Sequence, residues 1–117
     1  MKSILTALLL SISLIFSSGM VGHAQPFEKA FRAYQSGDFL TAVQEFATLA
    51  EQGNAAAQYN LGVMYRRGQG LAQNYEQAVK WYRKAAEQGN ADAQANLGLM
   101  YEKGKGVVQD YEQAVNW

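Results

Sequence analysis

The sequence predicts an all-α solenoid of stacked helix pairs, on three observations. Residues 51–81 overlay residues 87–117 at an offset of 36 positions, and 21 of the 31 compared positions are identical. Repeats of this length are typical of solenoids built from one supersecondary unit. Apolar and small residues recur at helical spacing within each unit. Residues that favour strands are few, because β-branched side chains are scarce and Ala is abundant.

Three helices are expected in the N-terminal half of the repeat region. Pro26 suits the first turn of an opening helix. The segment Phe39–Ala50 overlays Tyr75–Ala86 at the same offset, which predicts a second helix there. Asn54 stands where a helix N-cap is expected, and Gly68 stands where a left-handed residue ends a helix. These two residues therefore bound the third helix.

Three further helices are expected in the C-terminal half. Asn74 precedes a Gln by three residues, which is the spacing of a capping box, and the helix that it begins ends before Gly89. Asn90 and Gly104 bound the next helix as Asn54 and Gly68 bound theirs. Asp110 repeats the position of Asn74 and predicts a last helix that runs to the end of the chain.

Residues 1–24 have the pattern of an export signal. One Lys precedes the apolar run Ile4–Phe16, and small residues follow, among them Gly22 and Ala24 at the −3 and −1 positions of a cleavage site. We expect cleavage after Ala24 and an exported protein, periplasmic or secreted. The alternative is an uncleaved anchor that continues to Val21, although no basic cluster flanks the run.

Charge and composition exclude several classes of function. The whole chain has a net charge of zero, and residues 25–117 carry nine Lys and Arg against ten Asp and Glu. This balance gives no reason to expect nucleic acid or, after signal cleavage, a membrane as partner. The chain has no Cys, its one His is His23, and Ser36 is the only Ser after residue 24. We therefore expect no Ser-His or Cys-His catalysis, no metal site and no cofactor.

Two glycine pairs admit a second interpretation. Gly68-Gln69-Gly70 and Gly104-Lys105-Gly106 are reminiscent of phosphate-binding loops, but no strand pattern precedes them and no Gly-Lys-Ser/Thr follows. We interpret them as helix–helix connections that need positive φ angles. The carboxylates near helix ends do not form a distinctive acid–base pair either, so the protein is not expected to be an enzyme.

The identical positions resemble a known repeat. They follow the pattern Ala57-x3-Leu61-Gly62-x2-Tyr65 and then Tyr75-x2-Ala78-x2-Trp81-Tyr82. This pattern resembles the Sel-1-like repeat of the tetratricopeptide repeat superfamily. The resemblance divides the mature chain into a tetratricopeptide-like first repeat (25–50), a Sel-1-like repeat (51–86) and a second one truncated in its last helix (87–117).

The resemblance implies both architecture and role. It implies a right-handed α-α superhelix of tetratricopeptide-like helix pairs whose concave groove binds a protein or peptide. It also implies a place in cell-envelope assembly or host interaction, because exported bacterial members are often linked to these processes. Some exported relatives carry a Cys pair in each repeat, and this chain has none.

Five of the ten positions that differ between the two full copies lie on one side of the first helix. At about 100° per residue they fall within an arc of roughly 100°. Projected onto all three units, this arc predicts a partner-binding surface, which we call the variable stripe. The stripe comprises Glu28, Arg32, Gln35, Tyr59, Val63, Arg66, Arg67, Asp92, Leu99, Glu102 and Lys103.

Two interpretations of the variable stripe remain open. Its residues differ either because the face is merely solvated, or because a groove changes its chemistry from unit to unit. In the second case the groove is basic and aromatic around Tyr59, Arg66 and Arg67. It is then mixed or acidic around Asp92, Glu102 and Lys103 on the next first helix.

The sequence leaves three functions in competition. The first is a non-enzymatic scaffold that binds a protein or peptide in the groove. The second is an envelope enzyme accessory or a hydrolase of cell-wall or β-lactam-like substrates, and the third is a structural spacer. Because residue 117 matches Trp81 in the middle of a helix, we also expect a truncated form that is weakly stable or self-associates through its open C-terminal edge.

Overall fold

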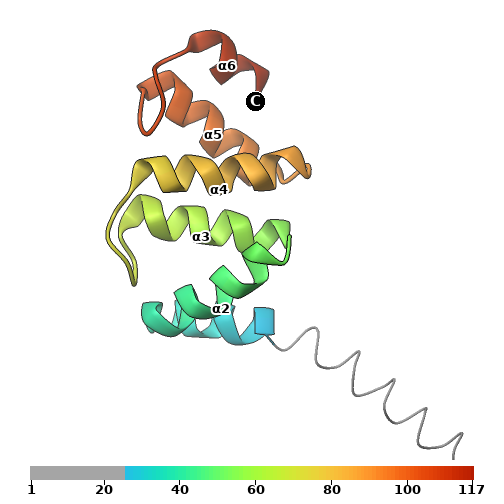
Figure 1. Cartoon of the computed structure of the whole chain (residues 1–117), viewed down its shortest axis with the longest axis vertical. Helices are drawn as coiled ribbons and strands as arrows, with labels where there is room; N and C mark the ends of the chain where they lie inside the picture. The colour runs from blue at the N-terminus through green and yellow to red at the C-terminus, as the bar shows by residue number, and fades with distance from the viewer. Residues whose placement is uncertain (1–25) are drawn as a thin grey trace, which may run out of the picture.

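The computed structural model describes residues 26–117, and in this part of the chain every regular element is a helix (Figure 1). The all-α prediction is confirmed. The export signal and its cleavage after Ala24 lie outside the described residues. A first helix covers residues 26–35. The helices that follow are α2 (Phe39–Glu51), α3 (Ala55–Arg67), α4 (Tyr75–Glu87), α5 (Ala91–Lys103) and α6 (Tyr111–Asn116).

Each labelled helix begins at an Asp or Asn whose side chain accepts a backbone N–H in the first turn. Asn54 accepts from Ala57 at 2.9 Å, and Asn90 accepts from Ala93 at the same distance. These caps were predicted, as were those at Asn74 and Asp110. Asp38, which caps α2 through the N–H of Thr41, was not predicted. The caps fix where each helix begins, because they satisfy N–H groups that have no partner inside the helix.

The glycines after the first helix of each full unit turn the chain toward the second. Gly68 and Gly104 end α3 and α5 in the left-handed conformation, with φ of 68° and 63°. Gly70 also has a positive φ, and a Cβ there would lie 2.4 Å from the carbonyl oxygen of Phe39. The glycine pairs are therefore helix–helix connections, as expected.

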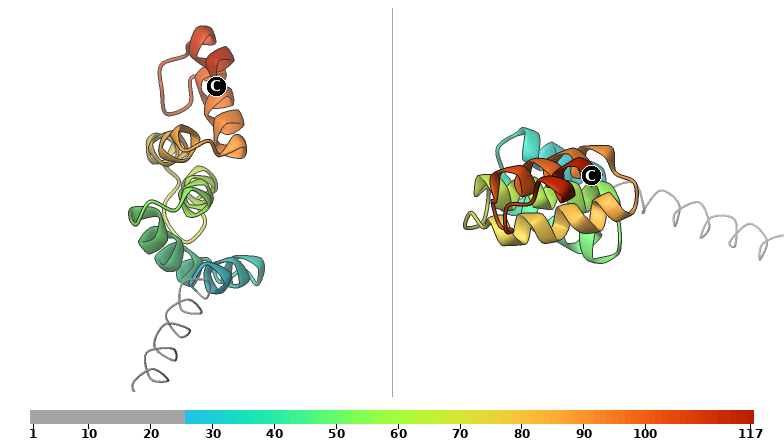
Figure 2. Two further views of the ribbon diagram at one scale, coloured as in Figure 1. Left: turned by 90° about the vertical axis from the view of Figure 1, so that its right-hand side faces the viewer. Right: turned by 90° about the horizontal axis from the view of Figure 1, so that it is seen from above.

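The helices alternate between two layers. Figure 2 shows the first helix, α3 and α5 on one side of the stack and α2 and α4 on the other. Consecutive helices pack on one another, from α2 against α3 through to α5 against α6. The variable stripe belongs to the layer that contains the first helix, α3 and α5.

Small residues let the layers approach closely, and aromatic rings fill the space between them. Gly62 on α3 faces the ring of Tyr82 on α4, so that a Cβ at residue 62 would lie 2.8 Å from two ring atoms. Tyr82 and Phe46 are both fully buried. Phe46 belongs to the core formed by the first helix, α2 and α3, whereas Tyr82 belongs to the core formed by α3, α4 and α5.

A buried glutamine joins successive units. Gln58 on α3 is 4% exposed, and its amide nitrogen donates to the carbonyl oxygen of Ala50 at 3.1 Å. Its amide oxygen accepts from Gln88 at 2.8 Å. Gln94, one repeat later, makes the equivalent bond to the carbonyl oxygen of Ala86. These bonds satisfy polar groups that packing removes from water.

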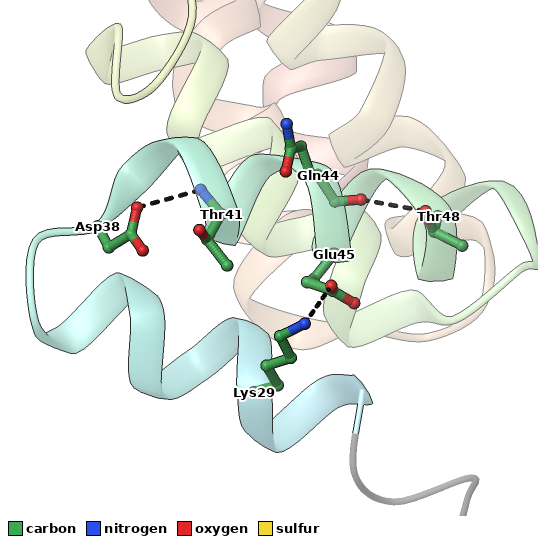
Figure 3. A network of polar contacts seen from close by, with 6 residues as sticks. All are labelled: Lys29, Asp38, Thr41, Gln44, Glu45 and Thr48. Atoms are coloured by element: carbon green, nitrogen blue, oxygen red, sulfur yellow. Dashed lines mark hydrogen bonds and ion pairs between the residues drawn. The ribbon is translucent and has the colours of Figure 1, made fainter.

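The first helix is tied to α2 by an ion pair that Figure 3 shows between Lys29 and Glu45. The Lys29 nitrogen lies 3.0 Å from the Glu45 carboxylate. The Lys29 side chain is 65% exposed and that of Glu45 is 29% exposed, so the pair contributes little to stability.

The last helix is the least buried part of the repeat region. No residue of α6 is buried, and Tyr111 and Val115 are 65% and 85% exposed. A hollow of about 410 Å³ lies between α5 and α6 and is lined in part by Gly98 and Trp117. In the preceding unit, the equivalent Gly62 is covered by Tyr82.

Among residues 26–117, every helix is too short or too polar to cross a lipid bilayer.

The contact between Gly62 and Tyr82 predicts a specific cost for a single methyl group. Gly62→Ala should lower the free energy of unfolding, because overpacking costs about 1–3 kcal/mol and exceeds the gain of about 1 kcal/mol in helix propensity. Urea denaturation of the full chain measures this difference. In a Tyr82→Leu background the cost should shrink, since the ring that the methyl group meets is gone. An equal cost in both backgrounds would contradict the assigned contact.

The two equivalent glutamines should differ in their contribution to stability. Gln58→Ala should cost about 1–3 kcal/mol, because it removes two hydrogen bonds at a buried position. Gln94→Ala removes one bond at a half-buried position and serves as the matched control, with a cost of about 1 kcal/mol or less. Chemical denaturation of both variants tests the difference, and equal losses would show that burial of the glutamine is unimportant.

Candidate functional site

The members of the variable stripe on the first helix are all exposed. Glu28, Arg32 and Gln35 face solvent, and the Glu28 carboxylate lies 3.9 Å from the Arg32 guanidinium. This is an exposed pair within one helix, so it contributes little to stability and leaves both side chains accessible.

The members on α3, apart from the exposed Arg67, are more deeply buried. Tyr59 is half-buried, and its ring centre lies 5.9 Å from that of Tyr82. Val63 is 6% exposed and belongs to the core formed with α4 and α5, which corrects its prediction as a contact residue. Its helical position borders the stripe, but the following unit covers it.

On α5 the stripe is exposed again. Asp92, Glu102 and Lys103 face solvent, and Leu99 is 48% exposed. Leu99 occupies the position of Val63 one repeat later.

An open cavity of about 160 Å³ lies between the C-terminal parts of α3 and α5. We call it the basic cavity. It brings together four members of the variable stripe, namely Arg66, Arg67, Leu99 and Lys103. It adds four residues that the stripe did not include, namely Tyr75, Asn96, Met100 and Lys105.

The remaining members of the stripe lie outside this cavity. Glu102, expected beside Lys103 in a mixed or acidic region, lines the hollow between α5 and α6 instead. Lys103 lies beside the arginines of α3. The neighbouring residues Glu102 and Lys103 therefore line different recesses. The acidic side chain lines the hollow between α5 and α6, and the basic one lines the cavity between α3 and α5.

The four cations of the basic cavity have no carboxylate partner among residues 26–117. The ion pairs in this part of the chain join Lys29 to Glu45 and Glu28 to Arg32, far from the cavity in sequence. Lys105 places its nitrogen 5.3 Å from the centre of the Tyr75 ring. Among residues 26–117, the positive charge of the cavity is therefore not paired with a carboxylate.

Each of the two arginines of the cavity donates a hydrogen bond to a tyrosine hydroxyl group. Arg66 donates from Nε to the hydroxyl of Tyr82 at 3.2 Å. Arg67 donates from Nη1 to the hydroxyl of Tyr34 at 3.1 Å. Burial raises the pKa of Tyr82, while Arg66 acts in the opposite direction. A tyrosine hydroxyl is uncharged near pH 7 even without this rise, so Tyr82 does not cancel the charge of Arg66.

The described residues offer no arrangement suited to a metal ion. Between residues 26 and 117, no three Asp, Glu, His or Cys side chains come together closely enough to ligate one. The chemistry that the basic cavity can perform is binding of a negatively charged group by guanidinium, ammonium and amide donors.

The residues that were missed had weak signals in the sequence. Asn96 is identical to Asn60 in the preceding copy, so a search for differing positions passes over it. Lys105 does differ from its counterpart Gln69, but it lies in a connection whose position cannot be read from helical spacing.

Comparisons with known proteins agree on the repeat. The Sel1 repeat family model matches residues 55–90 and 91–117. A comparison with curated protein sequences gives no match.

Several solved structures are similar. A Sel1 repeat protein from Oxalobacter formigenes has 42% identity and a TM-score of 0.74 over 78% of this chain and 37% of that one. A protective antigen present in uropathogenic Escherichia coli strains, displaying an SLR fold, has 39% identity and a TM-score of 0.78 over 90% of this chain and 24% of that one.

Cysteine-rich protein B of Helicobacter pylori has 28% identity and a TM-score of 0.62 over 64% of this chain and 56% of that one. The chain thus spans less than two thirds of the length of each of these three structures. The family match, together with the likeness in fold, shows that the chain belongs to the Sel1 repeat family.

Proposed function

We propose that the chain is an exported scaffold that binds a protein or peptide segment along the variable stripe. Sel1 repeats generally mediate protein–protein interaction. The observation that carries the proposal for this chain is the basic cavity. It joins residues of α3 and α5 into one recess on the layer that carries the stripe. Tyr and Arg, both present there, are frequent anchors of protein interfaces.

Export and the absence of catalysis are parts of this proposal. The pattern of residues 1–24 supports export to the periplasm or beyond. After residue 24 the chain has no His or Cys, and its one Ser, Ser36, donates to the carbonyl oxygen of Ala33. We therefore propose binding, with a role in envelope assembly or host interaction, ahead of cell-wall or β-lactam hydrolysis.

Site-specific photo-crosslinking tests the proposed binding surface. A photoreactive amino acid replaces Gln35 on the stripe, and in a matched protein it replaces Gln44, an exposed residue of α2. In a native envelope fraction we expect a discrete crosslinked protein from position 35 and none from position 44. The added substitution Arg67→Glu should weaken the crosslink at position 35, because it reverses a charge of the basic cavity.

Circular dichroism must first show that the two photoreactive proteins and the Arg67→Glu variant are equally helical. Equal crosslinking from both positions, or none from position 35, would contradict binding along the stripe. The chain would then serve as a structural spacer.

We also propose that a second copy of the chain covers the edge formed by α5 and α6. Tyr111 and Val115 are exposed apolar residues there, 65% and 85% accessible. Exposed apolar patches of this kind favour association.

Sedimentation velocity tests this association. The full chain should form a concentration-dependent dimer, and Val115→Lys should shift it to monomer because a charge would enter the apolar contact. Val108→Lys is the matched control, since Val108 is 88% exposed in the connection before α6. A parent protein that is monomeric at every concentration would contradict the proposal.

A further inference from the structure

We propose that the basic cavity receives the carboxylate of one Glu or Asp side chain of a protein partner, with an apolar residue of the partner next to it. This inference rests on the proposed function and specifies the chemistry of the partner. The occupant follows from the size of the cavity, its donors, its apolar wall and a comparison with the equivalent place in the preceding repeat.

The volume of the cavity is that of one side chain. At about 160 Å³ it is roughly half the lower end of the range for sites that bind whole small molecules, about 300–1,000 Å³. An open cavity of this size suits the end group of one side chain rather than a whole small-molecule ligand.

The donors suit a carboxylate. Each arginine uses one N–H on a tyrosine hydroxyl, and a guanidinium has five N–H donors in a planar fork. The fork matches the two oxygens of a carboxylate. The hydroxyl groups of Tyr82 and Tyr34 limit the motion of the two guanidinium groups, so less conformational entropy is lost on binding.

Part of the lining is apolar. Leu99 and Met100 of α5 line the cavity together with the cations, and Leu99 is 48% exposed whereas Met100 is 4% exposed. A recess that combines cations with a leucine and a methionine therefore fits an acidic residue that has an apolar neighbour. A nucleic acid fits less well, because residues 25–117 carry more acidic than basic side chains and give no extended positive surface.

The preceding repeat supplies an internal comparison. At the offset of 36, Lys105 corresponds to Gln69, and Lys103 corresponds to Arg67. In the earlier unit, the hydroxyl of Tyr34 donates to the amide oxygen of Gln69 at 3.0 Å and accepts from Arg67 at 3.1 Å. These bonds join the first helix, the connection and α3 across the equivalent place.

The later unit lacks this bridge. The counterpart of Tyr34 in this unit is Tyr65. Its hydroxyl cannot donate a hydrogen bond to Lys105, because an ammonium group has no acceptor atom. The place that is joined by hydrogen bonds in one unit is thus an open, positively charged recess in the next.

Helix dipoles explain only part of this arrangement. Arg66, Arg67 and Lys103 lie in the last turns of α3 and α5, where positive charge is favoured. The dipole does not account for Lys105, which follows the end of α5. Nor does it account for the convergence of both helix ends on one cavity with Asn96.

The test uses two small probes that differ in one group. N-acetyl-Leu-Glu-amide carries one carboxylate beside one apolar side chain, and N-acetyl-Leu-Gln-amide is its neutral isostere. Each is titrated into the full chain labelled with ¹⁵N at constant ionic strength. We expect the Glu probe to give saturable shifts of the Asn96 side-chain amide and the 103–105 backbone, and the Gln probe to bind about tenfold more weakly.

Two lysine variants locate the binding. Lys105→Gln introduces the residue that the preceding unit already has. It should abolish saturable binding of the Glu probe, because it removes one cation and lets Tyr65 and Lys103 close the recess. Lys80→Gln, an exposed lysine of α4 outside the cavity, should leave binding unchanged. Equal binding of the two probes, shifts centred on another surface, or no saturable shift would overturn the inference.

The outcome separates this inference from the proposed function. A crosslink from position 35 together with no binding of the Glu probe would remove the acidic specificity and leave the scaffold role intact. Binding of the Glu probe together with no crosslink from position 35 would leave the carboxylate site and remove the proposed binding along the stripe.

Discussion

The close approach of α3 to α4 at Gly62 is the constraint on which the rest of the structure depends. The absence of a side chain at this residue lets the ring of Tyr82 lie fully buried between the two layers. The hydroxyl of the same tyrosine accepts from Arg66, which lines the basic cavity. One packing contact thus fixes both the core of the repeat and the position of a guanidinium group at its surface.

The repeats share this packing and differ in the chemistry that they present. Asn caps, glycine turns and the glutamine bonds between units recur at the offset of 36. Where the units differ, as at Gln69 and Lys105, a bridge of hydrogen bonds in one becomes a charged recess in the next. A solenoid can therefore change its binding properties without changing its fold, because each unit contacts only its neighbours.

The sequence predicted the fold well because its signals are local and repeated. Asn54 and Asn90 cap helices as expected, and Gly68 and Gly104 end them. The site was predicted less completely. Helical periodicity placed Arg66, Arg67 and Lys103 on one face, and the structure brings them to one cavity. It placed the buried Val63 on that face as well, because periodicity does not show what the next unit covers. Lys105 lies outside any helix, and only the path of the connection brings it to the cavity.

The side chain at position 105 is therefore the element that decides whether the second inter-repeat recess is bridged or open. A crystal structure of the full chain with Lys105→Gln tests this claim most directly. We predict that the hydroxyl of Tyr65 donates to the introduced amide oxygen and that Lys103 closes onto the same hydroxyl, as Arg67 does on Tyr34. A recess that remains open, with no bond from Tyr65 to the new side chain, would contradict the account.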